Sequence, residues 1–297
     1  MKNKKLEWYY HMMLLPGMIL LLTFSIIPMF GVVIAFEHYI PAKGIFHSAW
    51  IGLDNFKYML QIPDSKQVFI NTIVIAVSKI VGNLIVPLIF ALLLNEIRIT
   101  WFKRSIQTIV YLPHFLSWVI LASVLSANIF SLDGMVNQLI GLVGVKPIFF
   151  MASNSWFRAI VVGSDVWKEF GFGTIIYLAA ITGINPVLYE AAEMDGTTRF
   201  QNLRYVTLPG ITATIILLGT LALGNVMNAN FDQIFNLYNP LVYSAGDIID
   251  TFVYRTGLVN AQYGLATAVG LMKSGISFVL IVASYKLAAR FANYRIF

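Results

Sequence analysis

Long, nearly uncharged apolar runs are the feature that most restricts how this 297-residue chain can fold. A helix needs about 20 consecutive apolar residues to cross the hydrocarbon core of a bilayer, which is roughly 30 Å thick. Lipid offers no partners for backbone polar groups, so each long run is expected to be helical. The sequence predicts an all-α, polytopic membrane protein that forms a single transmembrane domain, residues 1–297. Its six predicted transmembrane helices are 12–36, 68–94, 105–130, 157–181, 211–231 and 265–289.

Composition agrees with this class and excludes several kinds of chemistry. Apolar residues make up 58% of the chain and charged residues 11%, with a mean hydropathy of +0.76, whereas soluble domains average about 25% charged residues. There are no cysteines, which excludes disulfides, thiolate metal ligands and a cysteine nucleophile. The histidines lack metal-ligand spacing and no Ser/His/Asp order is persuasive, so we predict neither a metal site nor catalytic residues.

Basic residues indicate the orientation of the chain. Six spans put both termini on one side, and the shorter loops of that side hold eleven basic residues against six in the longer loops opposite. The positive-inside rule makes the richer side cytoplasmic. Both termini and the loop 182–210 are therefore predicted to be cytoplasmic. The eleven residues are Lys2, Lys4, Lys5, Arg98, Lys103, Arg104, Arg199, Arg204, Lys286, Arg290 and Arg295.

The loop 182–210 predicts a short helix with well-marked ends. Asn185 is a suitable N-cap, and Pro186 suits the first helical position. Gly196 follows Asp195 and can adopt the left-handed conformation that ends many helices. A second short helix is expected from about residue 197 to residue 206.

Helices this short are marginal on their own and need a surface to pack against. One candidate is the membrane surface, where interfacial helices normally carry Lys and Arg. The first helix instead carries Glu190, Glu193 and Asp195, while Ala191 and Ala192 allow another backbone to approach closely. This pattern favours a groove in a partner protein, with the membrane surface as the alternative.

One sequence signature within this loop resembles a known family. It consists of Glu-Ala-Ala from Glu190, three residues, Gly196, nine residues, Val206, one residue and Leu208-Pro209. This pattern resembles the signature of bacterial ABC importer permeases of the type I fold, and the six spans extend the resemblance over nearly the whole chain. Further segments resemble the carbohydrate-uptake branch, in particular LplB-type permeases for oligo- and polysaccharides. These segments are 28–31, 41–44, 50–56, 167–169, 233–235 and 238–240.

The resemblance implies a multi-pass subunit of the bacterial cytoplasmic (inner) membrane that imports a carbohydrate, in particular an oligosaccharide. It implies five kinds of partner: a second permease of similar fold, two cytoplasmic ATPase subunits, an extracytoplasmic sugar-binding protein, the lipid bilayer and the carbohydrate substrate. No nucleic acid is expected. The residues that the resemblance assigns to ATPase coupling are Glu190, Ala191, Ala192, Asp195, Gly196, Leu208 and Pro209.

The chain contains no Gly-x-x-x-x-Gly-Lys-Ser/Thr sequence, the motif that cradles nucleotide phosphates. We therefore expect it to be no enzyme by itself and to bind no cofactor. ATP and Mg would be bound by the partner ATPase.

Ionisable groups at membrane depth usually face a cavity or each other. Asp165, Lys168 and Glu169 are spaced i, i+3 and i+4 on one helix face, and Trp167 lies beside them. One interpretation is a polar, aromatic-edged wall of a sugar pathway. The other is a structural ion pair, and the same residues could serve both roles. Lys79 is expected to pair with an acid or to extend to the interface, and the alternative is that it meets an anionic substrate.

A second polar stripe is predicted where the fifth span ends, at Asn225, Asn228 and Asp232, and Asn230 is expected beside it toward the outer rim. By resemblance, this stretch lies where sugar permeases contact substrate. The alternative is hydrogen bonding between helices, which Asn commonly supplies. Asp232 is expected at the outer rim.

A rival function is a secondary carrier or channel that works without an ATPase. It would use Asp165, Lys168 and Glu169 as a proton or ion relay within the membrane. Uptake by the purified chain in liposomes without ATP would favour it.

Overall fold

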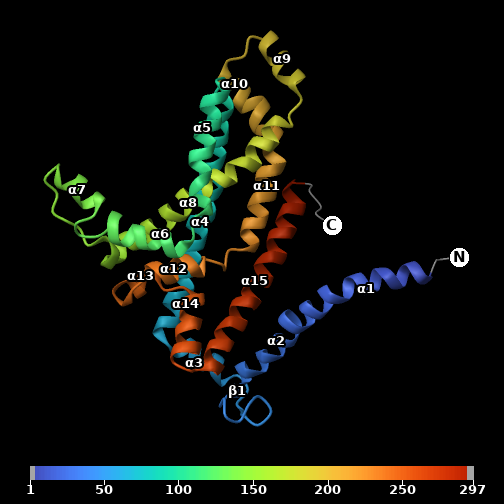
Figure 1. The fold of residues 1–297 in the computed structure, drawn as a ribbon, viewed down its shortest axis with the longest axis vertical. Coiled ribbons are helices and arrows are strands. Elements are labelled where there is room, and N and C mark those ends of the chain that lie inside the picture. The colour runs from blue at the N-terminus through green and yellow to red at the C-terminus, as the bar shows by residue number, and fades with distance from the viewer. Residues whose placement is uncertain (1–3, 293–297) are drawn as a thin grey trace. The chain divides into compact units, whose positions relative to one another are not determined.

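The computed structural model describes residues 4–292, and Figure 1 shows the helices that make up nearly all of it. Lys2 and Arg295, which contribute to the predicted orientation, lie outside the described residues. The helices are α1 (Lys4–Leu21), α2 (Ile27–Met29), α3 (Asp54–Gln61), α4 (Pro63–Glu96), α5 (Thr100–Tyr111), α6 (Trp118–Val124), α7 (Met135–Gly141), α8 (Asn154–Thr182), α9 (Pro186–Met194), α10 (Arg199–Asn202), α11 (Leu208–Gly224), α12 (Phe231–Leu237), α13 (Tyr243–Gly246), α14 (Ile249–Tyr254) and α15 (Tyr263–Ala292). Strands β1 (Glu37–His38) and β2 (Ala49–Trp50) form one short antiparallel pair.

Within residues 4–292, four helical stretches are long and apolar enough to cross a bilayer: Trp8–Phe36, Pro63–Glu96, Arg199–Gly224 and Tyr263–Lys286. Two bent pairs raise the number to six if each is one span. These pairs are Thr100–Phe115 with Trp118–Ile129, and Asn154–Thr182 with Pro186–Met194. The prediction of an all-helical chain with several membrane spans is confirmed.

The third predicted span, 105–130, is not one straight helix. The chain bends by 101° between Thr100–Phe115 and Trp118–Ile129. Pro113 lies in a 3₁₀ turn just before the bend, and proline lacks the N–H that a continuing α-helix needs. Ser117 then starts a new helix, because its Oγ accepts a hydrogen bond from the Ile120 amide at 3.4 Å.

The fifth predicted span, 211–231, begins earlier and ends earlier than expected. The second short helix predicted in the loop is not separate, since Arg199–Gly224 forms one continuous helical stretch. A capping box between Thr198 and Gln201 fixes its start. The α-helix stops at Gly224, so residues 225–230 lie outside it.

The chain divides into two compact units, residues 1–63 with 252–272 and residues 64–251 with 273–297. In the first unit, the Phe36 ring stacks on Trp50 at 5.6 Å. Asn55 Nδ2 donates to the carbonyls of Ala35 at 2.9 Å and Glu37 at 3.1 Å. These contacts fix α3 against the end of the first apolar stretch, whose side chains are largely exposed in the isolated chain.

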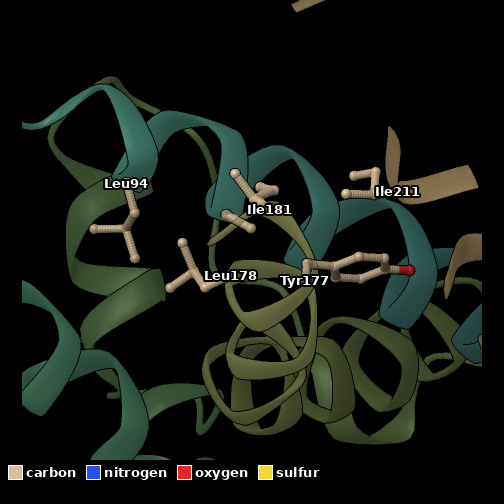
Figure 2. Packing of buried hydrophobic residues seen from close by; sticks show 6 residues of the cluster. Leu94, Tyr177, Leu178, Ile181 and Ile211 are labelled. Atoms are coloured by element: carbon tan, nitrogen blue, oxygen red, sulfur yellow. The ribbon is translucent and has the colours of Figure 1, made fainter. Parts of the chain in front are cut away.

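The second unit has a buried apolar cluster where α4, α8 and α11 meet (Figure 2). Leu94 comes from α4, Leu178 and Ile181 come from α8, and Ile211 comes from the start of α11. All four are less than one-tenth exposed. The cluster therefore joins α11 to the two long helices at the end that leads into α9.

Gly171 allows α8 to cross α5 closely, which gives a first prediction. A Cβ at Gly171 would overlap the Val110 carbonyl, a backbone group that cannot move aside alone. We expect Gly171→Ala to destabilise the protein by about 1–3 kcal/mol, because added core volume forces strain. Gly163→Ala on the same helix is the matched control, since a Cβ there meets nothing within 4 Å. Thermal unfolding of the two purified variants measures the difference, and equal midpoints would contradict the prediction.

Candidate functional site

A polar cavity of about 640 Å³ lies among α4, α8, α11 and the segment that follows α11. Its walls combine apolar side chains from the three helices with charged and amide groups. Pockets of this kind bind small molecules when a few polar groups converge on an otherwise apolar wall. The polar lining residues are Lys79, Asn83, Asp165, Glu169, Asn225, Asn228, Asn230 and Asp232.

The cavity unites most of the residues predicted for the substrate pathway. Asp165, Glu169 and the three asparagines all line it. Trp167 does not, since it lines a separate, almost wholly apolar cavity of about 680 Å³ between α6 and α8. Lys168 lines neither cavity. The predicted single polar face of α8 is therefore split between different surroundings.

A buried ion pair between Lys79 and Asp165 anchors one wall of the cavity. Lys79 Nζ lies 3.1 Å from Asp165 Oδ1, and both residues are only 5% exposed. The same ammonium donates to the Ala229 carbonyl at 2.8 Å and to the side-chain oxygen of Gln233. Asn83 Nδ2 donates to Asp165 Oδ2 at 2.9 Å. Buried charges need this many partners, because an unpaired one costs several kcal/mol.

Lys168 and Glu169 form a second structural group with a residue that the sequence analysis did not single out. Lys168 Nζ donates to the His114 carbonyl at 2.7 Å and to Glu169 Oε1 at 2.9 Å. His114 Nδ1 lies 2.7 Å from Glu169 Oε2, and its ring stacks on Phe172 at 4.2 Å. His114 reaches Glu169 because the chain bends after Pro113. Lys168 and Glu169 thus form the ion pair of the structural interpretation, while Glu169 also lines the cavity.

The asparagines lie on an irregular segment between α11 and α12, so the helical stripe predicted for them is wrong. Asn230 has a left-handed backbone (φ 70°), and its Oδ1 accepts from the Gln233 amide at 3.3 Å as the N-cap of α12. Asn228 Oδ1 accepts from the Asn230 amide at 3.4 Å. Asn225 Nδ2 donates to the Leu221 carbonyl at 3.2 Å. Both side-chain N–H groups of Asn228 and Asn230 remain without a partner among the described residues.

Helix α9 has the two ends predicted from the sequence. Asn185 Oδ1 accepts from the Val187 amide at 3.1 Å, and Pro186 is the first helical residue. Gly196 adopts φ +73°, and its amide donates to the Glu193 carbonyl at 3.0 Å. α9 lies beyond the adjacent ends of α5 and α11 (Figure 1) and has no buried residue. Glu190, Ala191, Ala192 and Asp195 therefore lie on a surface helix.

Two contacts attach α9 and the loop that enters it to the start of α11. Tyr189 Oη lies 3.0 Å from Thr207 Oγ1, immediately before α11. A Cβ at Gly210 would lie 2.7 Å from Ile184 Cδ1, which shows how closely the loop entering α9 packs on α11. Leu208 packs against the apolar cluster, and Pro209 occupies the first turn of α11. These contacts join α9 and the loop that enters it to the start of α11.

The apolar helices, the polar cavity between them and the attached surface helix define a membrane-embedded permease. The chain belongs to the family described as binding-protein-dependent transport system inner membrane component, whose model matches residues 85–293.

Individual relatives agree with this family over almost the whole chain. The polygalacturonan/rhamnogalacturonan transport system permease protein YteP of Bacillus subtilis (strain 168) is 40% identical over 97% of this chain and 90% of its own length. Protein LplB of the same strain is 40% identical over 99% of this chain and 92% of its own length. A chain of a bacterial ABC transporter involved in the import of the acidic polysaccharide alginate superposes with a TM-score of 0.90, at 36% identity and 98% coverage of both chains.

Three residues that line the cavity are not among the predicted pathway residues: Lys79, Asn83 and Asp232. An isolated lysine within an apolar run signals a buried pair, but the sequence does not identify its acid. Asp165 lies 86 positions further along the chain, and only packing of α8 on α4 brings the two together.

Proposed function

We propose that this chain is the transmembrane subunit of an ABC importer that moves a carbohydrate, in particular an oligosaccharide, across the bacterial cytoplasmic membrane. The observation that supports it most directly is the exposed helix α9 attached to α11 in a member of this transport family. Relatives of the chain carry polygalacturonan/rhamnogalacturonan or alginate in their names. A polar cavity between membrane helices is the matching route for a hydroxyl-rich substrate.

In the proposed topology the whole chain is one permease domain with six spans, two of them bent, and both termini are cytoplasmic. Two cytoplasmic ATPase subunits bind ATP and Mg and supply the energy. A second permease of similar fold supplies the other half of the pathway, and an extracytoplasmic sugar-binding protein delivers the substrate. One solved relative is a complex with an alginate pentasaccharide-bound periplasmic protein, which supports the last of these partners.

The proposed coupling surface is α9 with the turn at Gly196. Its exposed groups combine acids, Glu190 and Asp195, with large apolar side chains such as Met194, which is 89% exposed. A soluble partner would cover these apolar side chains. ATP binding in the ATPase pair moves α9, and the contacts of Tyr189 with Thr207 and of Ile184 with Gly210 pass that motion to α11 and the cavity wall.

The proposed substrate wall consists of Asp165, Glu169 and the asparagines of the segment after α11. Asn228 and Asn230 offer free N–H donors, and sugar hydroxyls accept such bonds. Trp167 and Lys168 are not proposed to contact the substrate. Trp167 borders the apolar cavity, and Lys168 is proposed to support the pathway by holding the Glu169 carboxylate in place.

Truncating one of these amides gives a second prediction. We expect Asn228→Ala to raise the KM for saccharide uptake by about tenfold, since removing a hydrogen bond to a substrate costs about 1–1.5 kcal/mol. Asn236→Ala is the control, because Asn236 is an exposed amide outside the cavity. Uptake by the complete importer in liposomes measures both variants. An unchanged KM for Asn228→Ala would remove this residue from the proposed wall.

Co-purification and reconstitution test the proposed function. Solubilised membranes should yield this chain together with an ATPase and a second permease, and saccharide uptake by their liposomes should require ATP. The rival is a carrier that works alone through its intramembrane charges, but Lys79, Asp165, Lys168 and Glu169 are engaged in fixed pairs. Uptake by the purified chain without ATP would favour that rival and refute the importer.

A further inference from the structure

The cavity described above contains no cation that is available to a substrate. Among its lining residues within the described chain, Lys79 is the only lysine or arginine. An ammonium has three N–H donors. Those of Lys79 face three acceptors: Asp165 Oδ1 at 3.1 Å, the Ala229 carbonyl at 2.8 Å and the side-chain oxygen of Gln233. None is left for a ligand.

The neighbouring lysine, Lys168, is also engaged within the protein. Lys168 Nζ contacts the His114 carbonyl at 2.7 Å and Glu169 Oε1 at 2.9 Å, and it does not line the cavity. Its charge compensates Glu169, whose other oxygen lies 2.7 Å from His114 Nδ1. Lys79, Asp165, Lys168 and Glu169 therefore form two neutral pairs.

The remaining charge at the cavity is negative. Asp232 is exposed at the cavity wall, and its carboxylate forms no ion pair within residues 4–292. A uronic-acid oligosaccharide carries one carboxylate on each sugar. Such a ligand would lose water without gaining a cation, and it would approach a like charge. This wall therefore disfavours an acidic saccharide.

The neutral polar groups of the same wall suit hydroxyls. Asn228 and Asn230 present free N–H donors, while Asn225 uses one N–H on the Leu221 carbonyl and keeps its Oδ1 as an acceptor. The free N–H groups can donate to a hydroxyl or to a carboxylate, but only a hydroxyl can also donate to Asn225 Oδ1, because a carboxylate only accepts. We propose that the saccharide which passes this wall is uncharged, an inference that rests on the proposed import function and specifies its substrate class.

The test uses the complete importer in liposomes, with its binding protein and ATP. Uptake is compared for neutral trisaccharides of galactose, glucose, xylose and arabinose, and for trigalacturonate and trimannuronate. We expect at least one neutral trisaccharide to enter about tenfold faster than either uronate. Import of a uronate as fast as the best neutral sugar would overturn the inference and leave the importer function standing. If ATP drives no saccharide, the proposed function fails, and this inference fails with it.

Two charge variants test the role of the wall itself. Reversing one nearby charge, in Asp232→Lys, should raise uptake of trigalacturonate relative to the neutral trisaccharide by roughly fivefold. Asp133→Lys is the matched control, because Asp133 is also an exposed acid but does not line the cavity. We expect no change of the ratio in that control. A ratio that is unchanged in Asp232→Lys, or that rises equally in both variants, would contradict the proposed role of Asp232.

Discussion

Replacing Gly196 with Val is expected to lower ATP-driven uptake about tenfold or more while the chain still inserts into the membrane. The backbone at Gly196 has φ +73°, a conformation that costs an L-residue about 1–2 kcal/mol, and β-branched residues tolerate it least. A Cβ at this position meets nothing within 4 Å, so the change acts through the backbone alone. It would distort the end of α9 and weaken its fit to the proposed ATPase groove.

Gly144→Val separates coupling from general strain. Gly144 has φ +79° and equally open surroundings, but it follows α7 rather than α9. This control should lose similar stability and keep its ATPase partner. Co-purification of the ATPase, together with uptake per assembled complex, measures the difference. If both glycine variants lost uptake to the same degree, strain in general would explain the result and the coupling role of α9 would be abandoned.

Replacing Lys79 with Met is expected to destabilise the protein by about 3–5 kcal/mol. Lys79 and Asp165 are buried, and removal of one partner leaves an uncompensated charge in a low-dielectric setting. The Ala229 carbonyl and the Gln233 side chain would lose their shared donor as well. The segment that carries the asparagines should therefore loosen, and the Tm of the purified importer should fall.

Two further variants show whether the lost ion pair causes this effect. Adding Asp165→Asn to Lys79→Met removes the unpaired charge and should restore part of the stability. Lys57→Met breaks the exposed pair of Lys57 and Asp54, whose atoms are 3.0 Å apart but whose side chains are 71% and 63% exposed. That change should cost less than about 1 kcal/mol. Equal Tm losses for Lys57→Met and Lys79→Met would show that breaking the buried ion pair costs no more stability than breaking the exposed one.

Local sequence rules predicted the ends of α9 because those ends depend on neighbouring residues. Asn185 caps the helix two residues away, and Gly196 supplies a left-handed turn that needs no distant contact. The same rules could have located the break in the third span, since Pro113 lies four residues before the new N-cap Ser117. Hydropathy alone missed it, because apolar residues continue on both sides of the bend.

The polar cavity could be predicted only in part. Of the predicted pathway residues, Asp165, Glu169 and the three asparagines line the cavity and Trp167 and Lys168 do not, and the asparagines were expected on a helix that in fact ends at Gly224. Which residue pairs with which charge depends on how α4 packs against α8 and on where the chain bends after His114. Those contacts join residues 54 to 86 positions apart, beyond the range of any local pattern.

The sequence by itself determined the membrane class, the helical composition and the helix with marked ends that follows the fourth predicted span. It did so because bilayer thickness, backbone hydrogen bonding and capping act on contiguous residues. Only the tertiary structure decided that Lys79 pairs with Asp165 and that Lys168 pairs with Glu169 and donates to the His114 carbonyl. It also decided that asparagine side chains and the Asp232 carboxylate are the polar groups left in the cavity to meet a ligand. A buried charge pairs with the oppositely charged group that lies nearest in space. Which group that is depends on how helices that are far apart in the sequence pack together.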